Sequence, residues 1–172
     1  MNHTTSMRGF TLIEMVVYLT LYSMIMAGAV LAAYSLFESS ERNQTKAMVQ
    51  EEGSFLTGKV DWALTGAASA ATSSDGLMLT VVKFNPSAGN PIVFTVSGGD
   101  MTLGRSGNPA PPVLNNDDVL LTCPPVGCFT RTDATGDGIN PESIEAHFTL
   151  HATTSDGLPF SQNFSTVKFL RK

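Results

Sequence analysis

The side chain with the strongest chemical implication is Glu14, a carboxylate at the start of a long apolar segment. Residues 15–37 contain no charged residue and no proline, and as a helix they would extend roughly 35 Å. That length is enough to cross the hydrocarbon core of a membrane, about 30 Å thick. Because an ionisable group at membrane depth is costly and rare, we expect Glu14 to have a functional partner. The alternative is a surface position at the membrane interface, where acidic residues are tolerated.

The two cysteines, Cys123 and Cys128, are the second candidate for chemistry. Pro124-Pro125-Val126-Gly127 separates them, and such a turn-rich tetrapeptide can bring their Cα atoms within disulfide range. In an oxidising compartment we expect a local disulfide; two free thiols are the alternative. A metal site would need more ligands than these two residues offer.

A third candidate is the acidic segment that begins Asp133-Ala134-Thr135-Gly136-Asp137-Gly138. Oxygen ligands at alternating positions before a glycine suit Ca²⁺, and Asp133, Asp137 and Glu142 are the candidate ligands. The twelfth position counted from Asp133 is Ile144, where a calcium loop of this type requires a bidentate acid. We therefore favour a solvated turn, with calcium binding as the weaker alternative and no cofactor as the main expectation.

Catalytic constellations are not recognisable in the sequence. His147 and His151 would share one face of a strand roughly 13 Å apart, too far to hold one metal together. We find no nucleophile elbow, no phosphate-binding glycine loop and no Cys–His pairing with a known signature. We therefore expect a protein that is not an enzyme.

Composition limits the classes of partner. The 172 residues carry a net charge of −5, and the basic residues are scattered, so we predict no nucleic-acid surface. The leader before the apolar run has Arg8 and no acid, which favours a cytoplasmic N-terminus with the remainder facing outward. A cleavable secretory signal is disfavoured, because its apolar region would be shorter and followed by a small-x-small site.

The elements that must position these residues begin with one long helix. Residues 1–9 form a leader and residues 10–37 a membrane half of the helix. Residues 38–64 continue it with an amphipathic pattern. Gly53 and Gly58 are expected to weaken it, and Trp62 is expected in the core at the helix–sheet junction. The predicted apolar face comprises Met48, Val49, Phe55, Leu56, Val60, Ala63 and Leu64.

Residues 65–172 are predicted to hold a linker and an antiparallel sheet domain, which makes the fold α+β. The small polar residues 65–76 indicate the linker. Apolar alternation then predicts strands, with loops across residues 104–117 and 130–142. The predicted strands are residues 77–84, 91–96, 101–103, 119–122, 144–152 and 160–170.

The N-terminal residues also resemble a known family. The basic residue and glycine of Arg8-Gly9, followed by Phe10-Thr11-Leu12-Ile13-Glu14 and the apolar run, are similar to the class III signal of type IV pilins and type II secretion pseudopilins. The resemblance covers residues 8–37 closely and implies a pilin-like fold. It also implies that a prepilin peptidase cuts after Gly9 and N-methylates Phe10, and that Glu14 pairs with the N-terminal amine of a neighbouring subunit.

This resemblance sets our functional expectation. We expect a minor pilin or pseudopilin, stored in the bacterial inner membrane and assembled into a pilus or pseudopilus. Its partners would be the prepilin peptidase, other pilin or pseudopilin subunits, and membrane lipid. A membrane-anchored ligand-binding or adhesin module and a DNA-uptake subunit of the same filament type are the alternatives.

Overall fold

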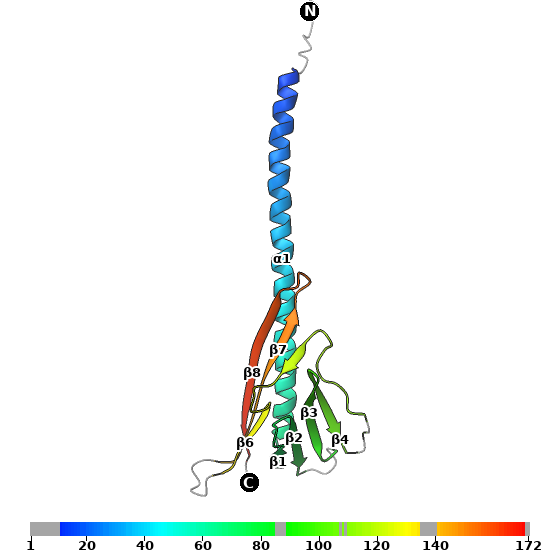
Figure 1. The fold of residues 1–172 in the computed structure, drawn as a ribbon, viewed down its shortest axis with the longest axis vertical. Helices are drawn as coiled ribbons and strands as arrows, with labels where there is room; N and C mark the ends of the chain where they lie inside the picture. Colours follow the sequence, from blue (N-terminus) through cyan, green and yellow to red (C-terminus); the bar gives the residue numbers. More distant parts are fainter. Residues whose placement is uncertain (1–10, 85–88, 107, 109, 135–140, 171–172) are drawn as a thin grey trace, which may run out of the picture. The chain divides into compact units, whose positions relative to one another are not determined.

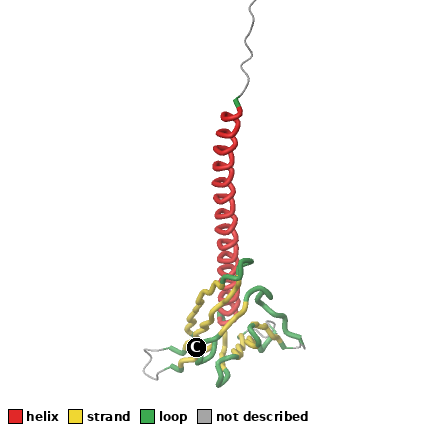
Figure 2. Tube along the Cα trace, turned by 45° about the horizontal axis from the view of Figure 1, so that its top comes forward, coloured by secondary structure: helices red, strands yellow, loops and turns green. Residues whose placement is uncertain are grey.

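The computed structural model describes residues 11–84, 89–106, 108, 110–134 and 141–170 (Figure 1). The chain forms two compact units, Met1–Arg42 and Asn43–Lys172. A single helix, α1 (Leu12–Leu64), contributes to both units and is unbroken along its length (Figure 2). The predicted α+β class with one long N-terminal helix is therefore confirmed.

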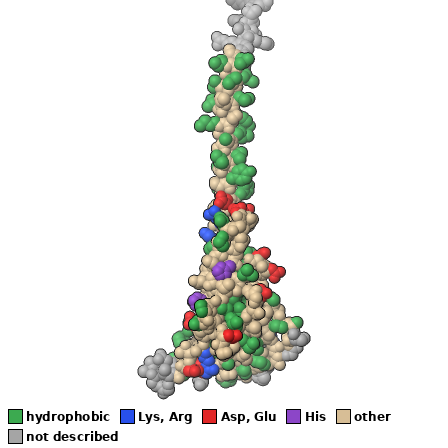
Figure 3. Space-filling view, in the orientation of Figure 1, with side chains coloured by type: hydrophobic (Ala, Val, Ile, Leu, Met, Phe, Trp, Pro, Cys, Tyr) green, Lys and Arg blue, Asp and Glu red, His purple; other side chains and the backbone are tan. Residues whose placement is uncertain are grey.

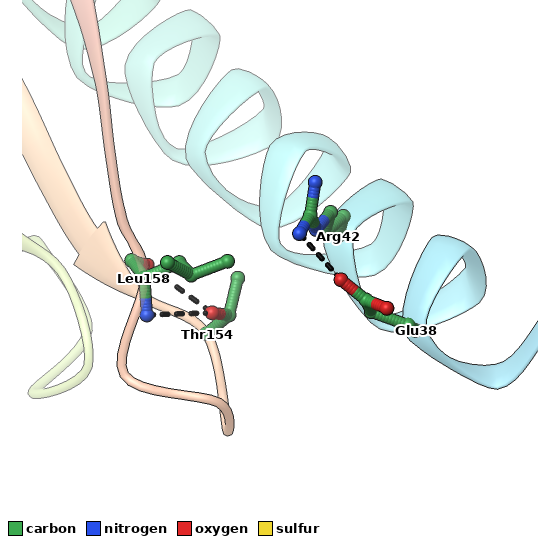
Figure 4. A network of polar contacts seen from close by, with 4 residues as sticks. All are labelled: Glu38, Arg42, Thr154 and Leu158. Atoms are coloured by element: carbon green, nitrogen blue, oxygen red, sulfur yellow. Dashed lines mark hydrogen bonds and ion pairs between the residues drawn. The ribbon is translucent and has the colours of Figure 1, made fainter. Parts of the chain in front are cut away.

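In the unit Met1–Arg42, the described part of α1 is covered with apolar side chains (Figure 3). Leu12 is 83% exposed and Phe37 is 68% exposed, and the side chains between them are exposed as well. After Glu14 the next charged residue is Glu38, which accepts a hydrogen bond from Arg42 one turn later (Figure 4). This pair has the spacing that stabilises an exposed helix surface.

In the unit Asn43–Lys172, the first sheet is an antiparallel meander of four strands. Its order is β1 (Ala67–Thr72), β2 (Met78–Lys83), β3 (Ile92–Ser97) and β4 (Asp100–Arg105). Three of these strands were predicted from the period-two pattern. The predicted linker at residues 65–76 is wrong in part, because it contains β1. This strand consists of alanine, serine and threonine and pairs with β2 through its backbone.

The second sheet is built around β7 (Ser143–Thr153). One side of β7 pairs with β5 (Leu120–Thr122) and β6 (Phe129–Thr132), and β8 (Pro159–Phe169) pairs along its whole length. The predicted final hairpin is confirmed, whereas β6 lies partly in a segment predicted to be loop. The β7–β8 turn is closed by Thr154, whose hydroxyl bonds both the N–H and the carbonyl of Leu158 (Figure 4).

The core of Asn43–Lys172 combines apolar residues of α1 and of both sheets. Leu56 and Val60 of α1 are fully buried, as are Phe94 of the first sheet and Phe148 of the second. Phe94 and Phe129 join the two sheets, with ring centroids 6.4 Å apart. This one cluster explains why the last third of α1 stays fixed on the sheets.

Two predicted core positions on α1 are wrong. Phe55 is 44% exposed and Trp62 is 42% exposed. The buried face of α1 is made instead by Val49, Gly53, Leu56, Val60, Ala63 and Leu64. Trp62 lies beside Lys83 and Arg105, whose cations lie 4.1 and 5.3 Å from the ring centroid. Contacts with these cations let the indole remain at the surface.

Gly53 has a packing role that the sequence did not suggest. The ring of Phe164 lies directly on it, so a Cβ at this position would be 2.1 Å from Phe164 Cζ. Phe164 in turn stacks on Phe148, with centroids 6.0 Å apart. The glycine therefore allows β8 to approach α1 closely.

Candidate assembly site

Glu14 lies in the first turn of α1, where it takes part in capping the helix. The carbonyl of Thr11 accepts from the N–H groups of Glu14 and Met15 at 3.1 and 3.3 Å, and the Thr11 hydroxyl donates to Glu14 Oε2 at 3.4 Å. Thr-x-x-Glu is the sequence pattern of a helix-capping box. A carboxylate here also interacts favourably with the helix dipole. Thr11 is thus a residue that sequence reasoning missed, although the spacing could have indicated it.

The Glu14 carboxylate is exposed in the single subunit, and so are the side chains that follow it. Gly9 and Phe10, the predicted processing residues, lie outside the described residues. A carboxylate at the exposed end of an apolar helix is available to a cation on a neighbouring chain.

The described part of this helix is long and apolar enough to cross a membrane by length and composition. Its most apolar stretch is not buried within the chain. A continuous apolar surface of this size is not stable in water. This surface is therefore suited to contact with lipid or with other apolar helices.

Cys123 and Cys128 form a disulfide, with their Cα atoms 4.8 Å apart. The bridged loop is closed by a hydrogen bond of 2.9 Å from Gly127 N–H to the Pro124 carbonyl. Gly127 of the loop lies against Gly76 of the β1–β2 turn, and directly after the loop Phe129 N–H donates to the Gly76 carbonyl at 2.9 Å. The disulfide thus constrains a loop that precedes β6 of the second sheet and packs against the β1–β2 turn of the first sheet.

The candidate calcium ligands that the structure describes are engaged by an arginine. Arg131 lies 2.8 Å from Asp133 and 3.2 Å from Glu142, and it also donates to the Ala70 carbonyl. Asp137 lies outside the described residues. Within the described part of the chain, His, Cys, Asp and Glu form no group of three that could hold a metal ion. Arg131 thus holds both described carboxylates in ion pairs, and the calcium alternative stays a prediction.

The histidines of β7 are strand residues, as expected. His151 Nε2 lies 2.8 Å from the Thr122 hydroxyl of β5, and His147 is exposed. They lie on the same face of one strand, and among the described residues neither forms a hydrogen bond or ion pair with a carboxylate. The contact between Thr122 and His151 links β5 to β7 within the second sheet.

The long apolar helix and the antiparallel sheets together define a pilin-like α+β fold. Residues 5–30 match the family described as "Prokaryotic N-terminal methylation motif". The chain therefore carries the N-terminal motif of type IV pilins and pseudopilins, which implies processing by prepilin peptidase. No curated protein and no solved structure matches the chain.

Proposed function

We propose that this chain is a structural subunit of a type IV filament or of a type II secretion pseudopilus. The observation that carries the proposal is the continuity of two features. The methylation motif at residues 5–30 overlaps the start of a helix whose apolar surface is exposed along residues 12–37. A subunit stored in a membrane and later packed helix against helix needs this combination.

Processing would prepare the assembly site. Cleavage of the Gly9–Phe10 peptide bond by a prepilin peptidase releases residues 1–9 and converts the amide nitrogen of Phe10 into an amine. Methylation of that amine leaves it able to carry a positive charge. The Glu14 carboxylate of a neighbouring subunit would then pair with this cation and set the register between adjacent helices.

Storage before assembly would be in the inner membrane, with the leader in the cytoplasm. The support is the basic Arg8 ahead of the apolar run. In this orientation Asn43–Lys172 faces an oxidising compartment, where the Cys123–Cys128 disulfide persists. Within the filament we propose a minor position, on the basis of the aromatic-rich strands, and quantification of its copies against the bulk subunit tests this.

The experiment that tests the proposal is the intact mass and N-terminal sequence of the protein recovered from membranes, with and without prepilin peptidase. We expect a product that begins at N-methylated Phe10, and full-length protein when the peptidase is absent. A protein that begins at Met1 in the presence of active peptidase would overturn the proposal. A membrane-anchored binding module would then be the better interpretation.

A further inference from the structure

One edge of the second sheet has no partner strand in the described part of the chain. β8 pairs with β7 through all eleven of its residues in a continuous register. On its other side it pairs with no strand that the structure describes (Figure 1). A long edge of this kind presents a row of unpaired backbone groups, which is a template for pairing with another chain.

The register determines which backbone groups of β8 point to its free side. The N–H of Leu170 donates to the Glu142 carbonyl at 2.8 Å, and the N–H of Thr154 donates to the Leu158 carbonyl at 3.0 Å. Because bonded pairs alternate along an antiparallel ladder, the even-numbered residues of β8 bond to β7. The odd-numbered residues direct their N–H and C=O groups outward, and no backbone hydrogen bond of the described residues reaches these groups. After Pro159 they are Ser161, Asn163, Ser165, Val167 and Phe169.

This edge lacks the features that normally block further pairing. Edge strands are commonly protected by a charged residue, a proline or a bulge. Pro159 lies at the very start of β8, and Lys168 is turned toward α1, where its Nζ lies 2.7 Å from Asp61. Residues 160–167 between them carry no charge and include no proline. The middle of the edge is therefore open to an added strand.

The opposite face of β8 is held against α1. Gln162 donates a hydrogen bond to the side chain of Gln50, and the Phe164 ring lies directly on Gly53. These contacts come from even-numbered residues, so they leave the outward backbone groups free. They also fix the strand before any partner arrives, which lowers the entropic cost of binding.

A hollow of about 600 Å³ adjoins the C-terminal end of this edge. Val167 and Phe169 of β8 line it together with Leu64, Ala67 and Phe84. Phe84 is 71% exposed and Phe169 is 59% exposed, so the rings leave apolar surface uncovered. Where a peptide adds to a sheet edge, main-chain hydrogen bonds give affinity and pockets for its side chains give specificity. The hollow is suited to a large apolar side chain on such a peptide.

We infer that β8 binds an extended segment of a different protein, which adds to the free edge as a further strand and places a large apolar side chain in the hollow. The proposed function does not require this partner, so the inference goes beyond it. The occupant must be an extended backbone, because only a strand offers donors and acceptors at the spacing of the outward groups.

A second copy of this chain fits the edge less well. Antiparallel pairing of two β8 strands along the whole edge would place Ser161 opposite Val167 and Pro159 opposite Phe169. Neither would fill the hollow with a large apolar side chain, and proline has no N–H to donate. A minor subunit, as proposed above, also has few identical neighbours.

Photo-cross-linking in cells tests this contact with the full-length chain. Benzoylphenylalanine in place of Ser161 should cross-link to one segment of a different protein, and mass spectrometry maps that segment. The same probe in place of Val126, which is 70% exposed in the disulfide loop, is the matched control. It should not cross-link to that segment.

A proline variant separates strand addition from a contact made by side chains. Ser165→Pro removes one outward N–H, takes no bond from β7, and leaves a carbonyl of the partner unpaired. It should reduce the cross-linked product about tenfold. Ser165→Ala keeps the N–H and should leave the product within about twofold of wild type. Thermal unfolding shows whether each variant keeps its fold, and Asn163→Pro serves as the second proline variant.

Hydrogen exchange of the detergent-solubilised chain provides a second measurement that needs no variant. Without a partner, the N–H groups of the odd-numbered residues 161–169 should exchange rapidly and those of the even-numbered residues slowly. A synthetic peptide with the sequence of the cross-linked segment should slow exchange at the odd-numbered residues alone. Equal protection of both sets in the isolated chain would mean that the edge is already covered, and it would overturn the inference.

Three cross-linking results would also overturn it. These are a product made of two copies of this chain, equal loss of product in Ser165→Pro and Ser165→Ala, and no product at all. Because leader cleavage is measured in the same membranes, each of these results can be told apart from a failure of the proposed function.

Discussion

At the scale of single residues, Gly53 determines how closely β8 packs on α1. Alanine is a better helix former by about 1 kcal/mol, but a Cβ at residue 53 would be 2.1 Å from the Phe164 ring. We expect Gly53→Ala to lower the free energy of unfolding by about 1–3 kcal/mol through overpacking. Urea unfolding of the detergent-solubilised chain measures this.

Gly58 supplies the matched control for this prediction. It lies in the same helix, and a Cβ there would meet nothing within 4 Å. Gly58→Ala should therefore stabilise the chain by up to about 1 kcal/mol, through helix propensity alone. If both alanine variants stabilised the protein equally, the Phe164 contact would not be the reason for glycine at residue 53.

The carboxylate of Asp75 accepts hydrogen bonds that link its titration to the stability of the fold. The Ser73 hydroxyl and then the Leu77 N–H donate to its carboxylate and hold its pKa below the ordinary value of 3.8. Because the folded-state pKa is depressed, the stabilisation is complete above the unfolded-state pKa, near 3.8. It is lost as the pH falls through the lower folded-state pKa.

We therefore expect Asp75→Asn to lower the urea midpoint at pH about 7, and we expect its difference from wild type to shrink as the pH falls through the lowered pKa of Asp75. Urea titrations across this pH range measure the difference between the two proteins. Ser73→Ala should act in the same direction, because it removes the larger cause of the shift. Parallel pH profiles for Asp75→Asn and wild type would contradict this explanation.

At the scale of elements, the disulfide loop and the β1–β2 turn contact each other through two glycines. A Cβ on Gly127 would be 2.4 Å from Gly76 Cα, and Gly127 has a φ of 93°. We expect Gly127→Ala to destabilise the chain by about 2–4 kcal/mol, because it adds a backbone clash to left-handed strain. Gly98→Ala, with a φ of 66° and open space, should cost only the strain, about 1–2 kcal/mol. Thermal unfolding of the two variants measures the difference. Equal midpoints for Gly127→Ala and Gly98→Ala would contradict the prediction that the contact with Gly76 adds to the cost.

The elements also show what the sequence could predict. The apolar run and the alternating pattern of β7 and β8 are local signals, and they predicted the long helix and the final hairpin. β1 was missed because alanine and serine have low strand propensity, and it forms through its pairing with β2. Helical periodicity wrongly predicted Trp62 in the core. The cations that hold its ring at the surface belong to Lys83 and Arg105, which are far from Trp62 in the sequence. Such long-range contacts have no local signature.

At the scale of the whole molecule, Glu14 combines two roles that a variant series can separate. It helps to cap its own helix together with Thr11, and it is proposed to pair with the amine of a neighbouring subunit. Loss of the cap alone costs about 1 kcal/mol of local helix stability. Loss of a partner for a cation in a medium of low polarity costs more, because the charge remains buried and unpaired.

We therefore expect Glu14→Leu to be processed normally but to fall at least about tenfold behind wild type in incorporation, when both are expressed together. Thr11→Val, which removes the hydroxyl and keeps the carboxylate, should be incorporated within about twofold of wild type, because a cap contributes little. The measurement is the ratio of tagged variant to wild type in sheared filaments, divided by the same ratio in membranes. Equal incorporation of Glu14→Leu and wild type would leave Glu14 with the capping role alone, and the register between subunits would then have to be set elsewhere along the apolar helix.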